Sequence, residues 1–140
     1  MDIYNYLTPK DKTYYMSTNT TLRQAIEIFD KYRFNCVPII DDEGKYITTI
    51  TEGDILRHLK NKCNFSLPST KVIKISEIEK HRPYKELDVF SNEKDIFDLS
   101  LDQSFIPVVD GRGVFIGILR RKEIIKYLYD FYMEKSRLIW

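Results

Sequence analysis

The sequence predicts an α+β fold made of two β-α-β-β-α units, packed sheet to sheet with pseudo-two-fold symmetry. The main observation is an internal repeat. The stretch VPIIDDEGKYITTITEGDILRHL (Val37 to Leu59) aligns without gaps with IPVVDGRGVFIGILRRKEIIKYL (Ile106 to Leu128). Strand-like and helix-like patterns also follow one another in the same order in both copies. With 140 residues, 43% of them hydrophobic and 31% charged, the chain is large enough for one compact globule with a real core.

Each copy of the repeated stretch opens with a short apolar run, CVPII or FIPVV, which predicts a strand with a proline near its start. The segments DDEG and DGRG then supply the Asp and Gly residues of a hairpin loop. A second apolar run predicts the returning strand, and a polar break opens a helix. The apolar residues of that helix recur at helical spacing: Ile55, Leu56 and Leu59 in the first copy, Ile124, Ile125 and Leu128 in the second. One such unit leaves a sheet face uncovered, so we expect two units to pair.

The elements around the repeated stretch follow from weaker patterns. Residues 13–16 (TYYM) predict a short strand, and Thr20 or Thr21 can cap a helix with apolar residues at Leu22, Ala25, Ile26 and Phe29. Residues 63–70 predict a linker that Pro68 interrupts. In the second copy we expect an early strand near 87–90, a shorter helix over 95–101 and a last helix from about 122 towards 137. The predicted repeats therefore span residues 1–66 and 67–140.

These residues resemble a known family. An apolar residue followed by Pro, a strand ending in Asp, a Gly hairpin and the pattern G-x-x-[ST]-x-x-[DN] at the opening of a helix are similar to the CBS domain, which occurs as tandem pairs called Bateman modules. The resemblance covers nearly the whole chain and implies a stand-alone CBS pair. It further implies a regulatory, non-catalytic module that binds an adenine-containing nucleotide, such as AMP, ADP, ATP or cyclic di-AMP, and signals to a partner protein.

In the first copy, the resemblance places the ligand where the second strand meets its helix. Thr51 would bind a phosphate and Asp54 a ribose diol, at a helix end whose free amides and dipole favour anions. The adenine would lie in a cleft formed by Tyr14, Tyr15, Asn35, Val37 and Pro38. The alternative is a capping box, in which Thr51 and Asp54 satisfy only the helix's own amides. Thr48 also stands where the family usually has Gly, which leaves a ligand less room at the backbone.

The second copy departs from the family pattern in another way. Gly117 is in place, but Arg120 replaces the Thr or Ser and Glu123 replaces the Asp. Three cations then follow one another at the positive end of a helix dipole, which is unfavourable unless an anion binds there. The alternative is that these side chains extend into water, where screening makes the cost small. The candidate nucleotide-binding residues of this copy are Arg120, Arg121, Lys122, Glu123, Phe105 and Pro107.

Other classes of function find little support. No metalloprotease, P-loop, nucleophile-elbow or dinucleotide motif is present, and neither His58 nor His81 has a motif partner, so we expect no catalytic residue, no metal site and no cofactor. Cys36 and Cys63 have no metal-ligand spacing and are expected to be free thiols. A net charge of +1 gives no reason to expect nucleic acid as a partner. Without a bilayer-spanning run or a signal peptide, we expect a cytoplasmic protein that does not enter a membrane.

Two hypotheses about function remain. The chain is either a nucleotide sensor or an interaction module with degenerate nucleotide sites, whose role is dimerisation or docking. Thr51 with Asp54 favours the first, whereas Thr48, Arg120 and Glu123 favour the second. The last helix carries more aromatic residues than one small core needs, so we expect a homodimer, although these side chains can also pack over the repeat pair itself.

Overall fold

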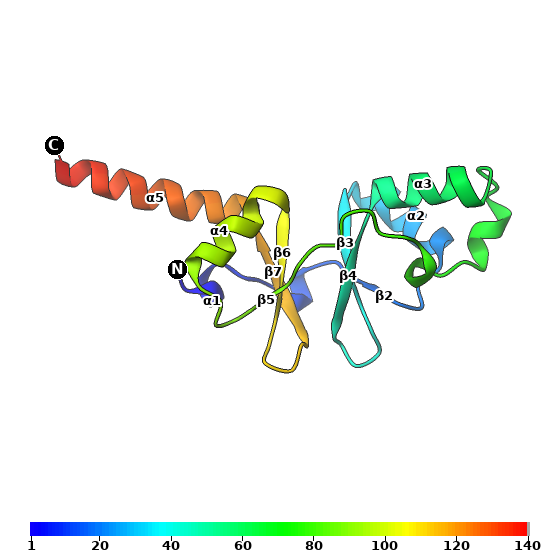
Figure 1. Ribbon diagram of the computed structural model, residues 1–140, viewed down its shortest axis with the longest axis horizontal. Coiled ribbons are helices and arrows are strands. Elements are labelled where there is room, and N and C mark those ends of the chain that lie inside the picture. The colour runs from blue at the N-terminus through cyan, green and yellow to red at the C-terminus, as the bar shows by residue number, and fades with distance from the viewer. Residues whose placement is uncertain (140) are drawn as a thin grey trace. The chain divides into compact units, whose positions relative to one another are not determined.

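The computed structural model describes residues 1–139, with only the backbone of Ile139, and contains two separate sheets together with helices (Figure 1). The chain divides into two compact units. The central unit comprises Tyr14–Tyr84, and the terminal unit joins Met1–Thr13 to the chain from Lys85 onward. The repeat bounds proposed from the sequence, 1–66 and 67–140, do not coincide with these units and remain a prediction.

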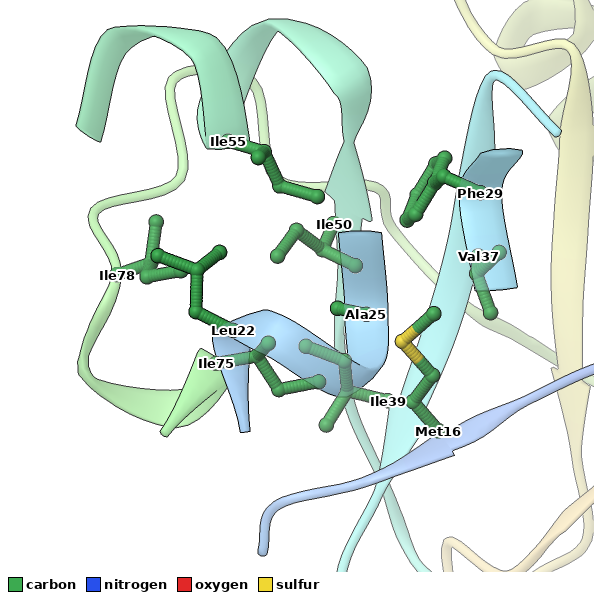
Figure 2. Close-up of a cluster of buried hydrophobic side chains, with 10 residues drawn as sticks. All are labelled: Met16, Leu22, Ala25, Phe29, Val37, Ile39, Ile50, Ile55, Ile75 and Ile78. Carbon is green, nitrogen blue, oxygen red and sulfur yellow. The ribbon is translucent and has the colours of Figure 1, made fainter. Parts of the chain in front are cut away.

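The central unit has a three-stranded sheet in the order β2-β3-β4. β2 (Met16–Ser17) runs parallel to β3 (Cys36–Ile40), and β3 pairs antiparallel with β4 (Tyr46–Thr51). The helices α2 (Leu22–Tyr32) and α3 (Glu52–Lys62) supply the apolar side chains that cover this sheet. Figure 2 shows the resulting core, which consists of Met16, Leu22, Ala25, Phe29, Val37, Ile39, Ile50, Ile55, Ile75 and Ile78.

The segment after α3 belongs to this same core. It contains two short 3-10 helices, η2 (Pro68–Lys71) and η3 (Ile75–Glu77), and it lies against the start of α2. Leu22 N–H donates to the carbonyl of Ile73, and Ile75 N–H donates to the carbonyl of Thr20. Ile75 is fully buried, so both backbone pairing and apolar burial fix the position of the segment.

The terminal unit has a four-stranded sheet in the order β1-β7-β6-β5. Its strands are β1 (Thr8–Pro9), β5 (Leu87–Asp88), β6 (Phe105–Val109) and β7 (Phe115–Arg120), and its helices are α1 (Ile3–Tyr6), α4 (Glu93–Asp102) and α5 (Arg121–Ile139), with a 3-10 turn η1 at Lys10–Lys12. β7 pairs antiparallel with both β1 and β6, whereas β5 runs parallel to β6. Ile3 of α1 is buried in the core of this unit, so the N-terminal segment contributes to the sheet and to the core.

Both predicted hairpins are confirmed, and they are built alike. Oδ1 of Asp41 accepts the N–H groups of Glu43 and Lys45, and Oδ1 of Asp110 accepts those two and four positions further on in its own loop. The glycine of each loop has a positive φ, 81° at Gly44 and 83° at Gly113, which explains the glycine in both copies.

Some element bounds differ from the sequence prediction. The early strand is shorter than TYYM suggested and lies at Met16–Ser17, because the exposed Tyr14 ring packs against Tyr32 and Phe34 and does not extend the sheet. Thr21, the second of the two candidate caps, begins α2 by a capping box with Gln24. The predicted second-copy helix over 95–101 is extended at both ends, and its cap is Asn92.

Candidate functional site

Thr51 and Asp54 form a complete capping box at the start of α3. The Asp54 N–H donates to Thr51 Oγ1 at 3.1 Å, and the Thr51 N–H donates to Asp54 Oδ2 at 3.0 Å. The helix therefore begins here because two side chains satisfy amides that have no partner within it. This arrangement is the capping alternative drawn from the spacing alone.

Asp54 makes two further bonds that the capping box does not require. Its Oδ1 accepts from Nη2 of Arg57 at 2.9 Å and from the backbone N–H of His81 at 3.0 Å. The residue is only 3% exposed. A carboxylate has about four lone-pair sites, so the three donors leave room for one more hydrogen bond. The ribose role of Asp54 remains a prediction that this geometry neither uses nor blocks.

Lys80 and His81 extend this cluster from the segment that follows η3. Nζ of the half-buried Lys80 donates to the carbonyl of Ile75. Burial lowers the pKa of the Lys80 ammonium, and the negative charge of Asp54 partly offsets that shift. No sequence motif had placed Lys80 or His81 at a ligand site. The signal that could have indicated them is the run of three basic residues directly before Pro83.

The predicted adenine cleft is only partly assembled within the central unit. Asn35 lies beside the start of α3, because its carbonyl accepts from Glu52 N–H. Val37 is 1% exposed and belongs to the core in Figure 2, and Pro38 is buried next to it in β3. The centroid of the Tyr14 ring lies 4.3 Å from that of the Tyr32 ring, so Tyr14 belongs to a separate aromatic cluster. Tyr15 is exposed.

A pocket of about 540 Å³ lies beside α3. One wall is a single face of the helix and comprises Asp54, Arg57, His58, Asn61 and Lys62. The facing wall comes from the segment around η3 and comprises Ile73, Glu77, Glu79 and His81. Of the predicted site residues, the pocket contains Asp54 but neither tyrosine nor Asn35. The sequence could not reveal the facing wall, because its approach to α3 depends on the tertiary fold.

In the terminal unit, the three predicted cations differ in environment. Nε of Arg121 donates to the carbonyl of Ser100 at 2.8 Å, so this side chain ties the start of α5 to the end of α4. Arg120 and Lys122 are exposed, and neither they nor Glu123 has an ion-pair partner among residues 1–138. Phe105 and Pro107 are buried within β6. The structure thus leaves two of the three cations available to an anion.

Gly117 has a structural role that the sequence comparison did not reveal. A Cβ at this position would lie 2.2 Å from the carbonyl oxygen of Thr8 and 3.1 Å from Pro9 Cα. The missing side chain therefore admits β1 to the edge of β7. In the first copy Thr48 occupies this position, and its buried Oγ1 has no hydrogen-bond partner within the described part of the chain. The edge of β4 instead contacts the segment that follows η3 through Tyr46, whose hydroxyl donates to the carbonyl of Tyr84.

Two further observations concern the part of the chain that the structure describes. No group of three or more His, Cys, Asp or Glu residues there is arranged to hold a metal ion. Within the same residues, no helix combines the length and the apolar character needed to cross a membrane.

Comparison with known proteins matches the chain to the CBS domain at residues 7–61 and 88–130. Among curated proteins, an uncharacterized protein of Rickettsia prowazekii is 24% identical over 88% of this chain, and the Arabidopsis thaliana chloride channel protein CLC-f is 37% identical over 35% of it. The chain spans only 36% of the length of the first relative and 6% of the second.

Solved structures share the fold at low sequence identity. A CBS domain protein from Streptococcus pneumoniae has a TM-score of 0.82 and 23% identity, over 92% of this chain and 87% of its own. CbpB of Listeria monocytogenes in complex with c-di-AMP has a TM-score of 0.78 and 19% identity, over 95% and 98%. CBSX2 in complex with AMP has a TM-score of 0.71 and 21% identity, over 94% and 98%. The predicted resemblance and the α+β class with tandem repeats are therefore confirmed, while the packing of one sheet on the other remains a prediction.

Proposed function

Since the chain belongs to the CBS-domain family, we propose that it is a regulatory, non-catalytic module that binds an adenine-containing nucleotide and signals to a partner protein. AMP, ADP, ATP and cyclic di-AMP are the candidate ligands. Support comes from two proteins of similar fold that were solved with adenine nucleotides, CbpB with c-di-AMP and CBSX2 with AMP. We expect the module to lie in the cytoplasm and to use no metal or other cofactor.

The observation that carries this proposal is the state of Asp54. Its carboxylate is buried and held by three donors, yet it keeps capacity for one more hydrogen bond. An acceptor that is already oriented loses little conformational entropy when a ribose hydroxyl binds to it. Thr51 would contribute at the adjacent helix end, and the adenine would contact Tyr14, Tyr15, Asn35, Val37 and Pro38.

The second repeat would bind through a different set of side chains. Arg120 and Lys122 are exposed cations near the start of α5, where a phosphate would relieve their unfavourable position at a helix N-terminus. Glu123 would accept from a ribose, and Phe105 and Pro107 would lie behind the base. Arg121 would act indirectly, because its guanidinium already holds α4 to α5.

The second candidate function is an interaction module that forms a homodimer. It is favoured by α5, which runs well past β6 and β7 in Figure 1 and carries large apolar side chains that its own unit leaves exposed. Only Ile124 of this helix is buried among residues 121–138. The exposed large apolar residues are Ile125, Leu128, Tyr129, Phe131, Tyr132, Met133 and Leu138. A second copy of the chain would cover them.

Isothermal titration calorimetry with AMP, ADP, ATP and cyclic di-AMP tests the hypothesis that the chain is a nucleotide sensor. We expect Asp54→Asn to weaken binding by about tenfold or more, because a hydrogen bond to a charged acceptor is lost. Glu52→Gln is the matched control, since this exposed carboxylate lies on the same helical turn and should leave affinity unchanged. The double variant Arg120→Ala/Lys122→Ala tests the second repeat. Circular dichroism must show each variant folded before its affinity is compared.

The outcomes separate the two candidate functions. No heat of binding for any nucleotide at millimolar concentration would refute the sensor for these ligands. Sedimentation of the same samples then tests the interaction module, which predicts a dimer that Tyr132→Glu converts to a monomer. A monomer that binds no nucleotide would contradict both candidates.

A further inference from the structure

The pocket beside α3 carries opposite charges on its two walls. The cations Arg57 and Lys62 lie on the helix wall, together with the side chains of His58 and Asn61. The only carboxylate of that wall, Asp54, is already paired with Arg57. Glu77 and Glu79 lie on the facing wall. A small molecule in the pocket would therefore meet positive charge on one side and negative charge on the other.

The two charged walls do not close onto each other. Among the described residues the only ion pair in the pocket joins Asp54 and Arg57, which lie on the same helix. Lys62 and Glu79 have no hydrogen-bond or ion-pair partner in that part of the chain. Glu77 Oε2 already accepts the N–H of Lys74, so Lys62 and Glu79 are the charged groups that the two walls leave unused among the described residues.

The backbone holds this separation fixed. The facing wall is tied to the start of α2 by the Thr21–Lys74 bridge, and Ile75 and Ile78 anchor it in the core. At its far end the His81 N–H is bonded to Asp54 on the helix wall. These bonds and buried contacts hold the backbone of both walls in place, so the pocket belongs to the folded unit before any ligand binds. Its volume of about 540 Å³ lies within the range of about 300–1,000 Å³ typical of small-molecule sites.

We propose that this pocket is a second ligand site, which adjoins the proposed nucleotide site at Asp54, and that it binds a free α-amino acid. The carboxylate of the amino acid would bind Lys62 and the free nitrogens of Arg57, and its ammonium group would bind Glu77 and Glu79. A zwitterion matches both walls at once, whereas a polyphosphate would be repelled by the facing carboxylates. Such a site would make the module responsive to two classes of small molecule.

Isothermal titration of the full chain with the common L-amino acids tests the proposal. At least one amino acid is expected to bind. Its amide and its N-acetyl derivative each lack one charge, so each is expected to bind with an affinity at least about tenfold lower. Lys62→Met and Glu79→Gln should each cause a similar loss. Both side chains are exposed, so these variants should fold. Lys60→Met and Glu52→Gln are the matched controls on α3, because both lie outside the pocket.

Three results would overturn the proposal. The first is no binding of any amino acid at millimolar concentration. The second is binding that survives Lys62→Met and Glu79→Gln, or that both the amide and the N-acetyl derivative reproduce at full strength. The third is loss of nucleotide binding in Lys62→Met with no response to amino acids, which would assign the pocket to a nucleotide phosphate.

Discussion

Replacing Gly117 by alanine tests whether the N-terminal strand is built into the second sheet. The residue has a φ of +156°, and a Cβ there would lie 2.2 Å from the carbonyl oxygen of Thr8 and 3.1 Å from Leu7 Cδ1. The nearest atom belongs to the backbone, so no side-chain rotation can relieve the overlap. β1 must move away from β7 for the methyl group to fit.

The magnitude follows from two costs. A non-glycine residue in this region of φ costs about 1–3 kcal/mol. Displacing β1 breaks its pairing at Ile118 and Gly117 and loosens the contact of Ile3 with the core, which adds about 1–2 kcal/mol. We therefore expect a loss of about 2–5 kcal/mol in the free energy of unfolding. For a chain of this length that corresponds to a fall in Tm of roughly 6–15 °C.

Urea denaturation followed by circular dichroism, with hydrogen exchange over residues 3–9, measures both costs. Two other glycines provide matched controls. A Cβ at Gly111 meets nothing within 4 Å, so Gly111→Ala should be neutral or slightly stabilising. Gly113 also has open space but a φ of +83°, so Gly113→Ala isolates the backbone strain. If Gly117→Ala costs no more than Gly113→Ala, and residues 3–9 keep their protection, the overlap with β1 is not the reason for this glycine.

Three further predictions concern single side chains. Thr48→Val should raise the free energy of unfolding by about 1 kcal/mol, because it removes a buried hydroxyl that has no partner among the described residues. Thr49→Val should lower it, because the Thr49 hydroxyl is hydrogen-bonded to that of Tyr46, and equal urea midpoints for the two variants would contradict this. Arg121→Met should cost about 1–2 kcal/mol through loss of the bond to Ser100, while Arg120→Met should stay within about 0.5 kcal/mol in the same assay. The N–H groups of Arg112 and Val114 lower the pKa of Asp110, so its stabilising effect is present above the unfolded pKa of about 3.9 and is lost as pH falls through the folded pKa. Tm measured from neutral to acidic pH should fall less steeply in Asp110→Asn than in the unaltered chain, and identical profiles would refute the assignment.

Local patterns were sufficient for most elements and for one part of the candidate site. The Asp-Gly loops, the apolar faces of α2 and α3 and the capping box of Thr51 with Asp54 depend on residues within a few positions of each other. The constant register of the repeat likewise predicted two similar sheets. Such features can be predicted because burial and capping leave a periodic or short-range signal in the sequence.

The contacts that complete the site depend on residues far apart in the chain. His81 reaches Asp54 through a backbone N–H, and any residue but proline supplies that group, so its identity carries no signal. Glu77 and Glu79 face α3 only because Ile75 and Ile78 enter the core beside α2.

Sequence patterns alone were enough to predict the α+β class, the repeat, the family and the helix end at which Asp54 lies. The folded chain adds that β1 pairs with β7, so that Gly117 accommodates a strand and Met1–Thr13 joins the terminal unit. It also decided that Arg121 ties two helices together, while Arg120 and Lys122 stay exposed. The sequence specifies which side chain stands at each position. The residues that contact it often come from distant chain segments, which meet only when the core forms.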